Sequence, residues 1–379
     1  MNGLKRRGFL AAPLAAPLAA PLGAGMMAAD QAREVVAIGD GITMPPTVYA
    51  ELLSKLASGI EPDNYALGGV VEKLELRMAA ELGKEMAVWL PTGTLANHLA
   101  LRILSGDRRR ALVQAESHLY NDCGDCCQTL SGLNLIPLGA GRASFGLDDV
   151  EAAASRAAGG RVKTPIGAIQ IESPVRRKTG AMFPVQEMKR ISAWARAQGI
   201  GLHLDGARLF MAAAYSGISP KDYASLFDTV YVSMYKYFGA ASGAVLAGPR
   251  ALLSDLFHIR RTFGGGQHQA WPFAAVALHG MDGFSERFGK AVKISEEVLN
   301  GLKAEPRFVV ERVPNGTNLF YLQVKGVNAK TFQERARAAH LSLSASREDR
   351  FIVAVNETWN RAGAAEILGR FRSALSDLH

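Results

Sequence analysis

The sequence predicts an α/β protein with a large, mostly parallel seven-stranded sheet and a smaller C-terminal α+β domain. Seven short apolar runs alternate with helix-like segments through the middle of the chain. Such alternation is typical of a parallel sheet that is covered by helices on both faces. After a long helix-like stretch at about Phe284–Leu302, a second and shorter alternation runs to the C-terminus, which indicates the smaller domain.

The individual elements follow from apolar runs of strand length and from helical spacing between them. The seven strands are expected at Met86–Leu90, Ala111–Gln114, Leu133–Leu138, Ile166–Ile171, Gly201–Leu204, Thr229–Val232 and Gly243–Ala247. The second set is expected at Phe308–Val313, Asn318–Val324 and Phe351–Val355, with a final helix from about Ala364. We therefore divide the chain into residues 30–282, an N-terminal arm with the large domain, and residues 283–379, the small domain.

The first 29 residues are expected to be an export signal. Lys5-Arg6-Arg7 precedes an apolar, proline-interrupted run, and small residues follow near Ala28. This arrangement fits a secretory signal, and the paired arginines resemble the bacterial twin-arginine type, which exports folded proteins. The predicted location is the bacterial periplasm or the medium. The alternative is a low-complexity tail on a cytoplasmic protein.

The composition of the chain limits the classes of binding partner that we expect. The chain has 379 residues, of which 48% are hydrophobic and 21% charged, as in ordinary globular proteins. Its formal charge of +8 is spread along the chain without a basic, aromatic-interleaved stripe, so we do not expect nucleic-acid binding. The N-terminal apolar run is too short and too rich in proline for a stable membrane anchor.

Residues able to do chemistry follow the predicted strands, where parallel sheets bind their ligands. Asp205 directly follows the fifth run, and Lys236 lies in an aromatic loop after the sixth. A buried lysine has a lowered pKa and becomes nucleophilic. Gly93 and Thr94 open a helix, and a helix N-terminus binds phosphate. His118 follows the second run and could stack on a cofactor ring.

All three cysteines form one cluster, Cys123, Cys126 and Cys127. A Cys-x-x-Cys pair can be redox-active, and a local disulfide is possible in an oxidising compartment. A four-thiolate zinc site within one subunit is excluded because no second pair exists. Burial as small apolar side chains at a helix start is the favoured interpretation.

In this order, these motifs resemble the threonine aldolase family of pyridoxal 5'-phosphate (PLP) enzymes, which have the fold type I architecture of aspartate aminotransferase. The resemblance covers most of the chain after residue 36. The matching segments are Leu90-Pro-Thr-Gly-Thr-Leu-Ala-Asn97, His118, His203-Leu-Asp-Gly-Ala-Arg208, Lys236 with Gly239, Gly264-Gly-Gly266, and Arg350 before an apolar strand.

The resemblance implies a role for each of these positions. Lys236 would hold PLP covalently, Asp205 would pair with the pyridine nitrogen, and Gly93 and Thr94 would bind the phosphate. His118 would stack on the ring and act as a base. Arg208 would reach both the ring edge and the substrate, and Arg350 would bind the substrate carboxylate. The glycine loop implies a homodimer or homotetramer with active sites at the subunit interface.

The sequence departs from the family mainly on the substrate side. Gly39-Asp40-Gly41 replaces Ser-Asp-Thr, and Tyr65-Ala-Leu-Gly68 replaces Tyr-Gly-Asp-Asp. The loop Ser173–Thr179 lacks the family's histidine and instead contains three basic residues, which either bind an acidic substrate or are solvated. Tyr235 replaces the serine before the lysine. These changes predict a retained cofactor site with an altered substrate pocket.

Three functions therefore remain open. The first is a PLP-dependent aldolase that cleaves a threonine-like or phenylserine-like β-hydroxy-α-amino acid to glycine and an aldehyde. The second is another PLP reaction on an amino acid, namely β-elimination, racemisation or transamination. The third is a non-catalytic, exported redox protein that uses Cys123, Cys126 and Cys127.

Overall fold

A computed structural model describes residues 33–375 of the chain. The predicted signal segment, residues 1–29, lies outside the described residues. Within the described part, no helix combines the length and the apolar character needed to cross a membrane.

The larger of the two main sheets has seven strands. In spatial order these are β2 (Met86–Leu90), β8 (Ala244–Gly248), β7 (Thr229–Ser233), β6 (Gly201–Asp205), β5 (Ile166–Glu172), β3 (Arg110–Gln114) and β4 (Asn134–Leu138). Strand β8 is antiparallel to both of its neighbours, and every other pair is parallel. The predicted seven-stranded, mostly parallel sheet is confirmed, and each observed strand begins and ends within one or two residues of its predicted run.

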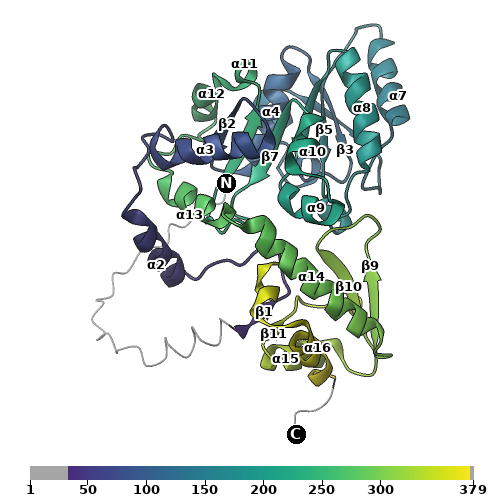
Figure 1. The fold of residues 1–379 in the computed structure, drawn as a ribbon. Helices are drawn as coiled ribbons and strands as arrows, with labels where there is room; N and C mark the ends of the chain where they lie inside the picture. The colour runs from purple at the N-terminus through teal and green to yellow at the C-terminus, as the bar shows by residue number, and fades with distance from the viewer. Residues whose placement is uncertain (1–32, 376–379) are drawn as a thin grey trace, which may run out of the picture.

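Helices cover both faces of this sheet because successive strand residues point to opposite sides. Val230 and Val232 pack with α3 (Gly69–Leu82), α7 (Leu147–Ala158), α8 (Val185–Ala197), α9 (Leu209–Ser216), α10 (Pro220–Ser225) and α13 (Trp271–Met281). Tyr231, between them, packs on the other face, which carries α4 (Gly93–Ser105), α5 (His118–Asn121), α6 (Cys126–Ser131), α11 (Arg250–Leu253) and α12 (Leu256–Thr262). The result is the three-layer arrangement at the top of Figure 1.

A smaller unit lies below the large sheet in Figure 1, and the long helix α14 (Phe284–Lys303) runs from one to the other. Its antiparallel sheet has the order β12 (Arg350–Ala354), β10 (Leu319–Val324) and β9 (Phe308–Arg312). Helices α15 (Ala329–Ala338) and α16 (Ala364–Ser373) pack in the same hydrophobic cluster. The predicted domain boundary between residues 282 and 283 lies just before α14 and stays a prediction.

The first described strand belongs with these C-terminal elements. Strand β1 (Val35–Val36) pairs with β11 (Leu341–Ser342), and Val35 is fully buried in the small unit's cluster. The arm then continues through residues 39–45 to α2 (Pro46–Ala57), which has no buried residue. Two short 3-10 helices complete the list of elements, η1 (Arg176–Lys178) and η2 (Glu357–Arg361).

Helix α4 lies unusually close to the sheet because glycines face it. A Cβ atom on Gly201 of β6 would come within 2.8 Å of Leu104, and one on Gly167 of β5 would come within 2.8 Å of the Ser105 Cα. At the other end of α4, a Cβ on Gly93 would overlap the Tyr231 hydroxyl. The start of α4 is thereby held against the carboxyl ends of β6 and β7.

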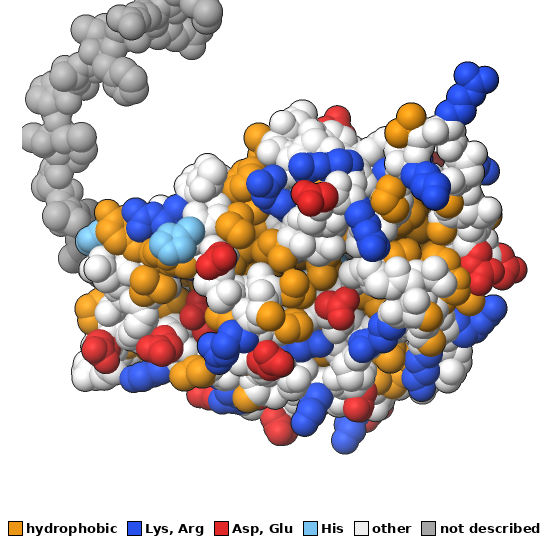
Figure 2. Space-filling view, turned by 90° about the horizontal axis from the view of Figure 1, so that it is seen from above, with side chains coloured by type: hydrophobic (Ala, Val, Ile, Leu, Met, Phe, Trp, Pro, Cys, Tyr) orange, Lys and Arg blue, Asp and Glu red, His pale blue; other side chains and the backbone are white. Residues whose placement is uncertain are grey.

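Charge on the surface is mixed. On the face drawn in Figure 2, Lys and Arg side chains are interspersed with Asp and Glu side chains, and hydrophobic side chains lie between them.

Candidate active site

The predicted site residues gather at one edge of the large sheet. Glu172 and Asp205 are the last residues of β5 and β6, Lys236 follows the end of β7, and Gly93 begins α4. The carboxyl ends of neighbouring parallel strands meet at one sheet edge, so these side chains converge. The charges of Asp205, Glu172 and Arg208 all act on the Lys236 amine.

Lys236 has the environment of a nucleophilic amine. Burial, and next the neighbouring positive charge of Arg208, lower the pKa of Lys236 to about 8. Its Nζ lies 5.9 Å from the centre of the Tyr231 ring and 5.5 Å from that of the Tyr235 ring. A substantial fraction of the amine is therefore neutral near neutral pH, as covalent capture of a carbonyl group requires.

Asp205 is fixed by hydrogen bonds to both of its oxygens. Asn97 Nδ2 donates to Oδ2 over 2.6 Å, and the backbone N–H of Ala207 donates to Oδ1 over 3.1 Å. His203, two residues earlier on β6, contacts Asn97 Oδ1 through Nε2 at 2.8 Å. The sequence analysis did not assign Asn97 or His203 to the site, although the i, i+2 spacing on one strand face places His203 beside Asp205.

Arg208 is held by a carboxylate from the N-terminal arm. Its Nε donates to Asp40 Oδ2 over 2.8 Å, and the second guanidinium nitrogen lies 2.7 Å from the same oxygen. Burial alone would lower the pKa of Arg208, but the charge and hydrogen bond of Asp40 raise it further than burial lowers it. A Cβ on Gly41 would strike the backbone carbonyl of Lys236, so the arm packs directly against the lysine loop. Asp40 is a third residue that the sequence analysis did not assign.

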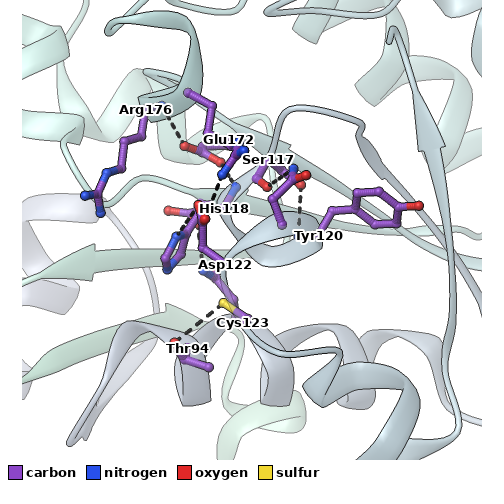
Figure 3. A network of polar contacts seen from close by, with 12 residues as sticks. Thr94, Ser117, His118, Tyr120, Asp122, Cys123, Glu172 and Arg176 are labelled. Atoms are coloured by element: carbon purple, nitrogen blue, oxygen red, sulfur yellow. Dashed lines mark hydrogen bonds and ion pairs between the residues drawn. The ribbon is translucent and has the colours of Figure 1, made fainter. Parts of the chain in front are cut away.

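His118 belongs to a polar network that Figure 3 shows. Glu172 accepts from the backbone N–H of His118 over 2.6 Å and from that of Arg176 over 2.9 Å. The imidazole Nδ1 lies 3.3 Å from Asp122 Oδ2. The neighbouring Cys123 side chain, and then the charges of Asp205 and Asp122, raise the pKa of His118 despite partial burial.

Glu172 is the buried centre of this network. Only 2% of the residue is exposed. Burial, and second the charge of Asp205, raise the pKa of Glu172 to about 7. The backbone of Glu172 is held by Gln114 on the neighbouring strand β3. The Gln114 side chain accepts from the Glu172 N–H over 2.7 Å and donates to the Glu172 carbonyl over 2.9 Å.

The cysteine cluster borders the site as a set of buried thiols. Cys123, Cys126 and Cys127 are free and buried, and α6 starts at Cys126. The Cys123 thiol donates to the Thr94 hydroxyl over 3.5 Å (Figure 3). Hydrogen bonding to Cys126, and then burial, raise the pKa of the Cys123 thiol well above its ordinary value. A thiol that stays protonated is a poor nucleophile, which argues against the redox hypothesis.

The loop Ser173–Thr179 is anchored to the polar network around His118. Arg177 pairs with Asp122 at 2.8 Å, and the Thr179 hydroxyl lies 2.7 Å from the Tyr321 hydroxyl on β10. Val175, in the segment that lacks the family's histidine, is fully buried. The loop thus connects His118 to the small unit.

Two further predicted positions lie outside this tight cluster. The Arg350 guanidinium lies 4.9 Å over the Tyr321 ring and forms an ion pair with Glu311. Its role in binding a substrate carboxylate stays a prediction. Gly264–Gly266 lies between α12 and α13, and a Cβ on Gly265 would come within 2.9 Å of the Arg260 carbonyl. Its predicted place at a subunit interface also stays a prediction.

The residues fit PLP on three independent features. The N-terminus of α4, with its Thr94 hydroxyl, suits a phosphate, and the close approach at Gly93 leaves no room there for a side chain. The anchored, buried Asp205 carboxylate suits a protonated pyridine nitrogen. The lowered pKa of Lys236 suits covalent attachment to an aldehyde.

Comparison with known proteins places the chain in a family that agrees with the geometry of the site. Residues 39–325 match the model of the family described as beta-eliminating lyase. Alanine racemase TOXG of Cochliobolus carbonum is 31% identical over 270 residues, covering 68% of this chain and 68% of that protein. The low specificity L-threonine aldolase of Saccharomyces cerevisiae is 31% identical over 208 residues, covering 54% of this chain and 53% of that protein, so the match spans about half of the yeast relative.

Solved structures agree on the fold. A proposed aromatic amino acid beta-eliminating lyase/threonine aldolase from Exiguobacterium sp. 255-15 superposes with a TM-score of 0.77 and 26% sequence identity. The superposition covers 91% of this chain and 99% of that one.

Proposed function

The chain belongs to the beta-eliminating lyase family and is a PLP-dependent lyase, and from that premise we propose that it cleaves β-hydroxy-α-amino acids to glycine and an aldehyde. The observation that carries the proposal is the pairing of a nucleophilic Lys236 with an imidazole, His118, anchored to the same sheet edge. PLP, when bound, supplies an aldehyde for the substrate amine and an electron-accepting ring.

The protein's own residues would divide the remaining tasks. Asp205 would keep a proton on the ring nitrogen, and the N-terminus of α4 would hold the phosphate. Arg208, fixed by Asp40, presents positive charge beside the lysine. His118 accepts the proton of the β-hydroxyl group, which must leave when the Cα–Cβ bond breaks.

Racemisation of an amino acid is the second candidate. It is favoured by the similarity to alanine racemase TOXG and by the buried Val175 in a loop that lacks the family's histidine. Racemisation breaks only the Cα–H bond, so it needs no base for a β-hydroxyl group.

One pair of assays separates the two reactions. The purified protein is supplied with PLP and given L-threonine, L-allo-threonine or phenylserine, and glycine and aldehyde are measured. The same protein is given L-alanine, and the formation of D-alanine is followed by chiral chromatography. Glycine and aldehyde in equal amounts support the aldolase, whereas D-alanine without aldehyde replaces it by the racemase.

A variant tests the assigned base. His118→Phe keeps an aromatic ring but removes the proton acceptor, so we expect a fall in kcat for aldol cleavage of about 100-fold or more, with PLP still bound. An unchanged kcat would remove His118 from the mechanism.

A further inference from the structure

Behind Asp205 lies a line of buried polar side chains that the sequence analysis did not assign to the site. The Thr229 hydroxyl on β7 lies 2.9 Å from His203 Nδ1. His203 Nε2 lies 2.8 Å from Asn97 Oδ1, and Asn97 Nδ2 lies 2.6 Å from Asp205 Oδ2. Thr229, His203 and Asn97 are each 0% exposed, so their polar groups need partners within the protein in place of water.

The chemistry of the end group sets the direction of every hydrogen bond. An ionised Asp205 accepts only, so Asn97 must turn its amide nitrogen toward it and its oxygen toward His203. His203 must then carry its proton on Nε2 and accept on Nδ1, which makes the Thr229 hydroxyl a donor. All three donors therefore point toward Asp205, and hydrogen bonds aligned in this way polarise one another.

His203 also remains uncharged. Burial lowers the pKa of His203 to about 4, although the Asp205 charge and a hydrogen bond with the Thr229 backbone act in the opposite direction. A neutral imidazole supplies a donor without a positive charge, which would otherwise compete with a ring nitrogen for Asp205.

We propose that Thr229, His203 and Asn97 form a one-directional relay that orients Asp205 toward the pyridine nitrogen of the cofactor. The proposal deepens the proposed function and rests on PLP binding at this site. The three are positioning residues, because they act through Asp205. The relay leaves the second lone pair of each Asp205 carboxylate oxygen free. Asp205 can therefore still accept a hydrogen bond from the ring nitrogen.

The geometry of the relay can be tested without cofactor. In the apoprotein, nitrogen-15 NMR of the histidine rings should show His203 as the neutral tautomer with its proton on Nε2, unchanged down to about pH 5. His203→Gln identifies the resonances by their loss. A proton on Nδ1, or protonation near the ordinary histidine pKa of about 6.5, would overturn the relay.

Its consequence is tested by the dissociation constant of PLP and by the pH dependence of the bound cofactor's visible absorption. A hydrogen bond to a charged group supports an expected increase in dissociation constant of about 10-fold or more for Asn97→Leu and His203→Leu. His203→Gln, whose amide can replace Nε2, should recover most of the affinity. Thr229→Val, the mildest change, should weaken binding about threefold and covers the case in which the leucine variants fail to fold.

His98→Gln is the matched control. His98 neighbours Asn97 on α4, is equally buried and has a pKa that burial lowers to about 4, but its Nε2 contacts Ser131 at 2.6 Å. It should lower stability and leave PLP affinity unchanged. If the parent protein fails to bind PLP, the proposed function fails while the NMR result still decides the relay. If PLP binds equally to the parent and to folded relay variants, only the relay role fails.

Discussion

At the scale of single residues, the site depends on how burial changes one amine. Lys236 lies in an aromatic loop, and its lowered pKa of about 8 reflects burial first and the Arg208 charge second. Lysines in water titrate near 10.4. A pKa lower by more than two units means that the neutral, nucleophilic form is more than about 100-fold more abundant at pH 7 than for a lysine in water.

This difference gives a direct pH prediction. Acetic anhydride reacts with neutral amines only, so the labelling rate of Lys236 in the apoprotein should rise with pH and level off just above pH 8. Free Nα-acetyl-lysine, added to the same samples and measured by mass spectrometry, serves as the control, and its labelling should continue to rise toward pH 10. If Lys236 followed the free lysine derivative across the range, the claim of a lowered pKa would be wrong.

The residues that sequence reasoning found and those it missed differ in kind. Lys236, Asp205 and Gly93 were predictable because each comes shortly after an apolar run, at the sheet edge where ligands bind. Asn97 and His203 were not assigned because their role depends on distance across two elements, α4 and β6. Asp40 lies more than 160 residues before its partner Arg208 in the chain, and no local sequence pattern predicts that ion pair.

At the scale of elements, the strands and their mostly parallel arrangement were predicted, but the order of the strands and the antiparallel exception were not. Short apolar runs between helical segments fix where strands begin and end, but nothing in such a run indicates whether its neighbour is parallel. The antiparallel β8 and the pairing of β1 with β11, about 300 residues apart, are therefore results of the structure alone.

The close packing of α4 on the sheet yields a stability prediction. Gly201→Ala places a methyl group 2.8 Å from Leu104, and overpacking of this kind costs about 1–3 kcal/mol. Part of this cost should disappear when Leu104→Ala is added, because that change removes the Leu104 Cδ2 and Cγ atoms at 2.9 Å and 3.3 Å, although the Cβ at 2.8 Å remains. Chemical unfolding of the single and double variants measures the coupling between the two positions.

A glycine-to-alanine substitution at another position should raise the free energy of unfolding instead of lowering it, which provides the control. Gly289 lies within α14 with open space around the position of a Cβ, so Gly289→Ala should stabilise the protein by about 0.5–1 kcal/mol through helix propensity. A destabilised Gly289→Ala, or a Gly201→Ala that costs nothing, would show that the spacing between α4 and the sheet is less restricted than described.

At the scale of the whole molecule, the site is assembled from distant parts of the chain. The arm supplies Asp40, α4 supplies Asn97, and the strand ends supply Asp205 and Lys236, so the cofactor site exists only when the large sheet and the arm are both in place. A protein of this kind must fold before it can load PLP. That requirement favours an export route that carries folded proteins, as the twin-arginine pattern at Arg6-Arg7 indicates.

We therefore propose that residues 1–29 direct export of the folded, PLP-loaded protein, and we expect the full chain to reach the periplasm of a bacterial host. The paired change Arg6→Lys with Arg7→Lys keeps the charge but removes the arginine pair, so it should retain the protein in the cytoplasm, whereas Lys5→Arg should export as the parent does. Cell fractionation measures whether the protein reaches the periplasm, and N-terminal mass spectrometry measures whether the signal segment is removed. The visible absorption of the periplasmic protein shows whether it carries PLP. An uncleaved, cytoplasmic parent would rule out export, and a periplasmic protein that lacked PLP until the cofactor was added would show that loading follows transport.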